Sequence, residues 1–167
     1  MSTAVVPRYA LVDHHGRAVT EQDFAGRYQL VFFGFTHCRI VCPAVLGKLS
    51  TVLDDLGPLA ERIQPIYVSV DPERDTPEVM CAFLEESYPR FLGLTGSPEA
   101  AEAARSAFRV YAGRGADPED PEGYAVPHTA LTYLLDPGAA YLAHFPDVLT
   151  ADEIAARIRE LCSTPAP

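Results

Sequence analysis

The pattern of apolar positions along the chain predicts alternating strands and helices. Residues 28–35 form an almost continuous apolar run, which is typical of a central strand buried on both faces. Residues 63–70 have the same character and predict a second inner strand. Between these runs, apolar side chains recur at helical spacing, and Gly57-Pro58 supplies a stop signal. We therefore expect a helix that begins between Ile40 and Pro43 and ends at Leu56.

The rest of the chain predicts a hairpin near each end and three more helices. The expected hairpin strands are 8–13 with 17–19, and 129–135 with 140–145. Thr76-Pro77, Ser97-Pro98 and Thr150 are expected helix starts, because a hydroxyl side chain caps free N–H groups and proline fits the first turn. The helix after Thr76 is expected to turn Val79, Phe83 and Leu84 inward.

These elements predict one α/β domain that spans residues 1–167. Their order is typical of a thioredoxin-like three-layer fold, with a central mixed sheet flanked by helices and an N-terminal β-hairpin. A chain of 167 residues is long enough for one domain with a proper core. Residues 113–123 are rich in Gly, Pro and acidic side chains and predict a surface loop. Residues 163–167 predict a frayed tail.

Two cysteines, Cys38 and Cys42, follow the first inner strand. We expect Cys38 in the turn and Cys42 in the opening of the helix, where partial positive charge and free N–H groups favour thiolate over thiol. Arg39 adds to that effect. Open α/β sheets place their sites at the carboxyl ends of their strands. The pair therefore predicts either a redox couple or a site for a soft metal.

Charge and hydropathy limit the partners and the compartment. The net charge of −10 argues against nucleic acid or an anionic membrane as a partner. The sequence has no apolar stretch near the roughly 20 residues of a membrane span, and its first residues lack a secretion signal. We expect a cytoplasmic protein from the chain as given, or a periplasmic, membrane-tethered protein if the N-terminus is truncated.

Four ordered segments of the chain carry a resemblance to a known family. They are Gly34-Phe35-Thr36-His37-Cys38 through Cys42-Pro43, Val70-Asp71-Pro72-Glu73-Arg74-Asp75-Thr76-Pro77, Phe91-Leu92-Gly93-Leu94-Thr95-Gly96-Ser97, and 124–137 with His128. Together they resemble the Sco/SenC family of thioredoxin-fold copper chaperones for cytochrome c oxidase. The resemblance covers roughly residues 9–161.

The resemblance implies a copper site made by Cys38, Cys42 and His128. Two thiolates and an imidazole suit Cu(I), and Cu(II) can be held if a water or another ligand joins. The implied function is to hold one copper for delivery or for thiol/copper redox chemistry. The implied partner is a copper-accepting or thiol-redox protein.

The chain departs from the family pattern beside all three implied ligands. The family usually reads Cys-Pro-Asp-Val-Cys, where this chain has Arg39 and Ile40 between its cysteines. The family usually has an acidic residue before its histidine, where this chain has Pro127. The loss of two nearby negative charges predicts weaker binding of a cation and stronger thiolate character.

Two other functions use the same residues, so whether the chain is an enzyme is left open. A soluble copper-dependent redox enzyme would use the three ligands and an open position for oxygen or a small-molecule thiol. A copper-independent thiol–disulfide oxidoreductase or peroxidase would use Cys38 to attack and Cys42 to resolve the mixed disulfide. An apolar pocket near His128 would favour the copper enzyme.

The other residues of chemical interest have simpler expected roles. His14 and His15 are expected as surface histidines in a turn. Cys81 is expected as a buried hydrophobic residue on a helix. Asp71 and Asp75 are expected to stabilise a loop, with a role in shaping the site as the alternative.

Overall fold

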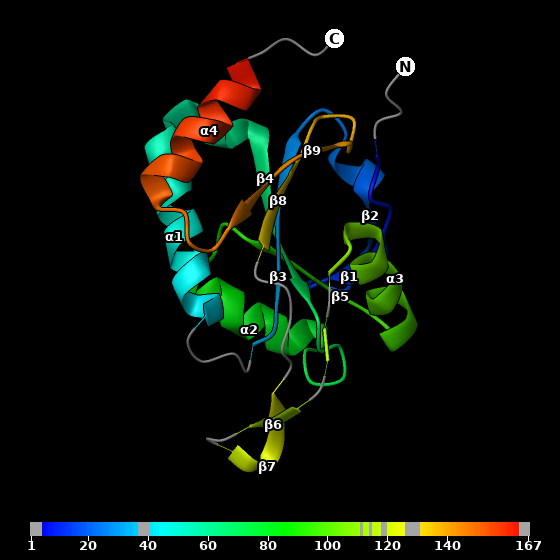
Figure 1. The fold of residues 1–167 in the computed structure, drawn as a ribbon. Helices are drawn as coiled ribbons and strands as arrows, with labels where there is room; N and C mark the ends of the chain where they lie inside the picture. The colour runs from blue at the N-terminus through cyan, green and yellow to red at the C-terminus, as the bar shows by residue number, and fades with distance from the viewer. Residues whose placement is uncertain are drawn as a thin grey trace.

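The apolar run at 28–35 forms an inner strand of a mixed sheet in the computed structural model, which describes residues 5–36, 41–110, 112–113, 115–117, 120–125 and 131–163 (Figure 1). The sheet has seven strands in the order β2 (Ala18–Thr20), β1 (Ala10–Asp13), β5 (Leu92–Thr95), β4 (Ile63–Ser69), β3 (Tyr28–Gly34), β8 (Leu131–Leu135) and β9 (Tyr141–Pro146). Strands β3, β4 and β5 run parallel, while β1, β2, β8 and β9 pair antiparallel to their neighbours.

Helices cover both faces of the sheet and make the fold three-layered. The helices are α1 (Val41–Leu56), α2 (Pro77–Ser87), α3 (Pro98–Phe108) and α4 (Ala151–Ser163), with 3-10 turns η1 (Glu21–Phe24) and η2 (Gly57–Arg62). Leu30 and Phe32 of β3 pack into the core shared with α1, α2 and α4, whereas Val31 and Phe33 pack toward α3. Every residue of β3 is buried, which explains its continuous apolar pattern. The predicted thioredoxin-like α/β fold is confirmed.

The predicted helix boundaries are also confirmed, since their caps form as expected. The hydroxyls of Thr76 and Ser97 accept backbone N–H groups of α2 and α3 at 3.3 and 3.1 Å. Thr150 and Glu153 form a reciprocal capping box at the start of α4, with contacts of 3.2 and 2.8 Å. Helix α1 ends where Gly57 adopts a positive φ of 57°.

One prediction about the inward face of α2 is wrong. Val79 is 38% exposed, while Met80 and Leu84 are fully buried and Phe83 is partly buried. Met80 and Leu84 are four residues apart and therefore share one face of the helix. The buried stripe is thus displaced by one position from the pattern expected at Val79.

Residues 113–123, predicted as a surface loop, contain paired strands. Strands β6 (Gly115–Asp117) and β7 (Asp120–Ala125) form a separate antiparallel ribbon with a register shift between Ala116 and Asp117. Main-chain pairing needs no alternation of apolar side chains, so the sequence pattern gave no signal for it. Figure 1 shows the ribbon projecting beyond one end of the main sheet.

None of the helices among the described residues combines the length and the apolar character needed to cross a lipid bilayer.

Gly93 allows α2 to lie close against β5. A Cβ atom at this position would lie 2.6 Å from Leu84 Cδ1 and 3.0 Å from Met80 Cε. It would also lie 3.4 Å from Nδ1 of His14. The absence of a side chain therefore permits the close approach of a helix and a turn at one point of the sheet.

We predict that Gly93→Ala lowers the free energy of unfolding by about 1–3 kcal/mol, because the added methyl group overpacks the contact with α2. Gly47→Ala is the matched control, since a Cβ at Gly47 on α1 meets nothing within 4 Å among the described residues. This control should stabilise the protein by about 0.5–1 kcal/mol through helix propensity. Urea denaturation measures both changes. Equal effects of the two substitutions would contradict the close approach.

Candidate metal centre

The three predicted ligands lie only partly within the described structure. Cys42 is the second residue of α1, as the sequence predicted. Cys38 and His128 lie outside the described residues, as do Arg39 and Pro127 beside them. The two-cysteine, one-histidine ligand set therefore stays a prediction, and the structure shows the segments that lead to it.

The described ends of three segments meet at one edge of the sheet. Strand β3 ends at Gly34, and the Gly34 carbonyl accepts the Val70 N–H at 2.8 Å. The pairing of Phe32 with Thr132 places the start of β8 beside the end of β3. Residues 37–40 connect β3 to α1, and residues 126–130 lead into β8. The chain connections to all three predicted ligands thus begin at the carboxyl end of β3, where open α/β sheets carry their sites.

A buried carboxyl group holds the chain just before Cys38. Asp75 is fully buried, and its carboxyl group accepts the backbone N–H of Thr36 at 3.0 Å and the Thr36 hydroxyl at 2.5 Å. The Ser69 hydroxyl, at the end of β4, donates to the same carboxyl group at 2.7 Å. Asp75 therefore joins the carboxyl ends of two neighbouring strands and fixes the residue two positions before Cys38.

Burial dominates the ionisation of Asp75. It raises the pKa of the carboxyl group above its ordinary value, although the hydrogen bonds from Thr36 and Ser69 act in the opposite direction. Protonation of Asp75 is consequently more favourable in the folded than in the unfolded chain. Its contribution to stability is present at low pH and is lost as the pH rises through the raised pKa.

The loop between β4 and α2 braces the same point. The Thr95 hydroxyl of β5 donates to the Asp75 carbonyl at 2.6 Å. Arg74 forms an ion pair with Asp71, and its guanidinium lies 5.8 Å from the centre of the Phe35 ring. Both aspartates were expected to stabilise a loop, and the bonds to Thr36 extend the role of Asp75 to the strand that leads to Cys38. Sequence alone gave no signal for that contact, because its partners are 39 positions apart.

The first turn of α1 lacks acidic side chains. Nothing in that turn therefore offsets the partial positive charge of the helix N-terminus. Such a position favours an anion.

An apolar cavity adjoins the start of β8. It has a volume of about 390 Å³ and lies on the α3 side of the sheet. Its lining includes Phe108, Leu131, Tyr133 and Tyr141, with His144 at one side. Leu131, the first residue of β8, follows the predicted ligand His128 by three positions in the sequence.

Cys162 lies in the core on the other side of the sheet, and His144 enters this arrangement only as part of the cavity lining. Cys162 is buried in the core formed with α1 and α4, and burial raises the pKa of its thiol. His144 is exposed on β9, where its ring contacts the Tyr141 hydroxyl.

We predict that Asp75→Ala lowers the free energy of unfolding by about 3 kcal/mol, because buried donors from Thr36 and Ser69 lose their acceptor. Asp55→Ala, which removes an exposed carboxylate from α1, is the control and should change stability by less than about 0.5 kcal/mol. Chemical denaturation at neutral pH compares the two variants. A loss at Asp75 no larger than the loss at Asp55 would contradict the anchoring role.

We also predict a pH signature for Asp75. Asp75→Asn keeps the shape of the side chain but cannot change its charge. The stability of the wild-type protein relative to this variant should fall as the pH rises through the raised pKa of Asp75. Denaturation curves across a pH series give the difference in the free energy of unfolding between the two proteins. A wild-type protein that gains stability relative to Asp75→Asn as the pH rises would contradict the raised pKa of Asp75.

The sequence is similar to a known family and to several known proteins. The family model described as SCO1/SenC matches residues 1–163. The chain is 38% identical to the mitochondrial SCO2 homolog of Danio rerio, over 93% of this chain and 56% of that protein. It is also 38% identical to the human mitochondrial SCO1 homolog, over 90% of this chain and 50% of that protein. The chain thus spans about half the length of these curated relatives.

Solved structures give the same result. The copper-bound ScoI of Arabidopsis thaliana superposes with a TM-score of 0.89 at 29% identity, covering 95% of this chain and 98% of that one. The copper-bound ScoI of Bradyrhizobium japonicum gives a TM-score of 0.83 at 37% identity, covering 95% and 99%. Sequence match, fold and strand-end geometry lead to one conclusion: this chain belongs to the SCO1/SenC family.

Proposed function

We propose that this protein binds one copper ion through Cys38, Cys42 and His128, for copper delivery or for thiol/copper redox chemistry. The observation that carries the proposal is the likeness to two ScoI proteins whose structures contain copper. That likeness covers 95% of this chain in both cases.

The donor chemistry supports copper. Two thiolates and one imidazole are soft or intermediate donors, and a set of three suits the low coordination number of Cu(I). The place of Cys42 in the first turn of α1 supports its thiolate form, because the helix N-terminus stabilises negative charge. The Asp75 bonds to Thr36 support a fixed approach of the chain to Cys38.

Residues beside the ligands tune the affinity in opposite ways. A Cu(I) ion with two thiolates has a net charge of about −1. Arg39 would compensate that charge once the metal is bound. The family carboxylates that Ile40 and Pro127 replace would repel the second thiolate, so their loss favours deprotonation of both thiols. The same loss removes attraction for the free cation.

Thiol oxidation is the second reaction open to the pair. A disulfide of the proposed thiol-redox partner can accept two electrons and two protons from the pair, which forms the Cys38–Cys42 disulfide, reduces the partner to a dithiol and leaves no thiolate to bind copper. Metal loading and disulfide formation therefore compete. A structural relative supports this reaction: BsSco, a cytochrome c oxidase assembly protein, is described as having a disulfide switch, and it superposes with a TM-score of 0.72 at 26% identity.

A copper-dependent enzyme is supported by the cavity beside β8. Its mainly apolar lining and its volume of about 390 Å³ suit a small molecule, and the lining includes Leu131, which follows His128 by three positions in the sequence. A thiol or oxygen could reach an open position on the metal from that side. Copper delivery needs no such cavity. A substitution that fills the cavity should therefore lower the activity of a copper enzyme and leave copper delivery unchanged.

The partner and the compartment are proposed at a coarser level. The partner is a copper-accepting or thiol-redox protein, and the net charge of −10 favours one with a basic surface. The cytoplasmic location stays a prediction, since relatives at 38% identity are named as mitochondrial.

We predict that the reduced protein binds one equivalent of Cu(I) tightly in an anaerobic titration against a competing chelator. His128→Ala should weaken binding by at least about tenfold, and Cys38→Ser or Cys42→Ser should abolish tight binding, because each removes a ligand. Oxidation of the two cysteines to a disulfide should have the same effect as their replacement.

His144→Ala is the matched control, because it removes an exposed histidine of β9 and should leave the affinity unchanged. The absence of tight copper binding, or binding indifferent to His128→Ala, would overturn the proposed ligand set. It would leave a dithiol redox protein.

A further inference from the structure

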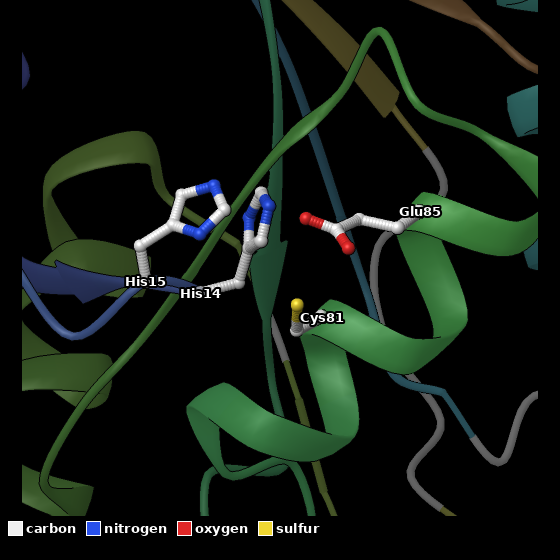
Figure 2. A group of neighbouring side chains, drawn as sticks. All are labelled: His14, His15, Cys81 and Glu85. Carbon is white, nitrogen blue, oxygen red and sulfur yellow. The ribbon is translucent and has the colours of Figure 1, made fainter.

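Four potential metal ligands gather between the β1–β2 turn and α2. They are His14 and His15 in the turn and Cys81 and Glu85 on α2, as Figure 2 shows. One donor atom from each residue lies within 4.8 Å of the donor atoms of the other three. A tetrahedral ion holds its donors roughly 3.3–3.8 Å apart. The difference is about 1 Å, which is the scale of a small side-chain rotation.

The sequence predicted the exposure of His15 correctly and the burial of His14 and Cys81 wrongly. His14 and His15 were expected as surface histidines, but His14 is buried at 8% exposure and only His15 is exposed. Cys81 was expected to be buried, but it is half-buried and lies beside these rings. The four-residue spacing in the sequence places Cys81 and Glu85 on one face of a helix. The sequence did not indicate that the β1–β2 turn, with His14 and His15, lies against that face.

The backbone of the turn is fixed before any ligand binds. The Asp13 carboxylate accepts the N–H groups of His15 and Arg17 at 2.9 and 3.0 Å. Gly16 takes the positive φ of 85° that closes the turn. The rings of His14 and His15 lie against each other with their centroids 4.1 Å apart. The two imidazoles therefore start from one fixed stretch of backbone, which lowers the conformational entropy lost when a ligand binds.

The opposite side of the cluster is equally well anchored. Cys81 and Glu85 are four residues apart on α2, so their side chains share one face. Their neighbours Met80 and Leu84 are fully buried against Gly93 of β5. This packing fixes the position of α2 relative to the turn.

His14 differs from the other three donors. The Gly93 N–H donates to its Nδ1 at 2.9 Å, so the proton of the neutral ring is on Nε2. A metal bound at Nε2 would move that proton to Nδ1 and displace the Gly93 hydrogen bond. His15, Cys81 and Glu85 are consequently the three ready donors, and His14 joins them only when its ring leaves Gly93.

The charges around the cluster suit a cation. Burial and the Glu85 and Glu78 carboxylates raise the pKa of the Cys81 thiol. Burial and the neighbouring His15 lower the pKa of His14, which keeps its ring neutral. A positive ion that replaces the thiol proton is attracted by the same carboxylates that retain the proton.

We propose that His15, Cys81 and Glu85, with His14 as a fourth ligand after rotation, form a second metal site that binds Zn²⁺. One thiolate with imidazole and carboxylate donors suits zinc, whereas Cu(I) prefers a site rich in sulfur. Zinc binding releases the Cys81 thiol proton to solvent and involves no electron transfer. The bound ion would connect the β1–β2 turn to α2 across the end of β5.

The test uses Co²⁺ as a spectroscopic probe for Zn²⁺ in a Cys38→Ser/Cys42→Ser variant, which removes the proposed copper thiolates. We expect one equivalent of Co²⁺ to produce a thiolate-to-cobalt absorption band and Zn²⁺ to displace it. Cys81→Ser on this background should abolish the band. His15→Ala and Glu85→Gln should weaken binding by at least about tenfold.

Cys162→Ser is the matched control, because it removes the other described free cysteine and should leave the band unchanged. Thermal denaturation gives an independent readout: Zn²⁺ should raise the Tm of the background variant and not that of its Cys81→Ser derivative. Equal Tm values of these two proteins without metal establish that the substitution itself leaves the fold intact. A band that persists after Cys81→Ser, or no saturable binding of either ion, would overturn the second site.

Discussion

The burial of β3 on both faces is the constraint on which the rest of the structure depends. A strand without a solvent face needs helices on each side of the sheet, and α1, α4 and α3 supply them. A strand with neighbours on both edges also ends beside other strand ends. The proposed copper site follows from that placement, because the segments that carry its ligands join the described chain where β3 and β4 end and β8 begins.

A single buried carboxyl group, that of Asp75, fixes the position of the chain just before Cys38. The buried carboxyl group of Asp75 accepts hydrogen bonds from Thr36 and Ser69, and the two bonds from Thr36 hold that residue in place. Such a group is stabilising only while its donors remain in place. The geometry before Cys38 is therefore coupled to the loop between β4 and α2, which also contains Asp71 and Arg74.

The chain places cysteines in two different chemical settings. Cys42 lies in the first turn of α1, which contains no acidic residue, and its proposed pairing with Cys38 would favour thiolates and a soft ion. Cys81 stands alone with a carboxylate and imidazoles, which favours a thiol until a borderline divalent ion replaces its proton. The number of thiolates would therefore determine which metal each proposed site selects: Cu(I) at the cysteine pair and Zn²⁺ at the Cys81 cluster.

The sequence by itself determined the inner strands, the helix caps and the family. The spacing of apolar residues, the cap residues and the family motifs each depend only on residues a few positions apart. The one-residue error at Val79 and the ribbon at β6 and β7 mark the limit of that local information. Only the tertiary structure decided that Asp75 would meet Thr36 and that His14 and His15 would meet Cys81. Those contacts join distant segments through Gly93 and the strand order, and no pattern along the chain records which distant side chains become neighbours.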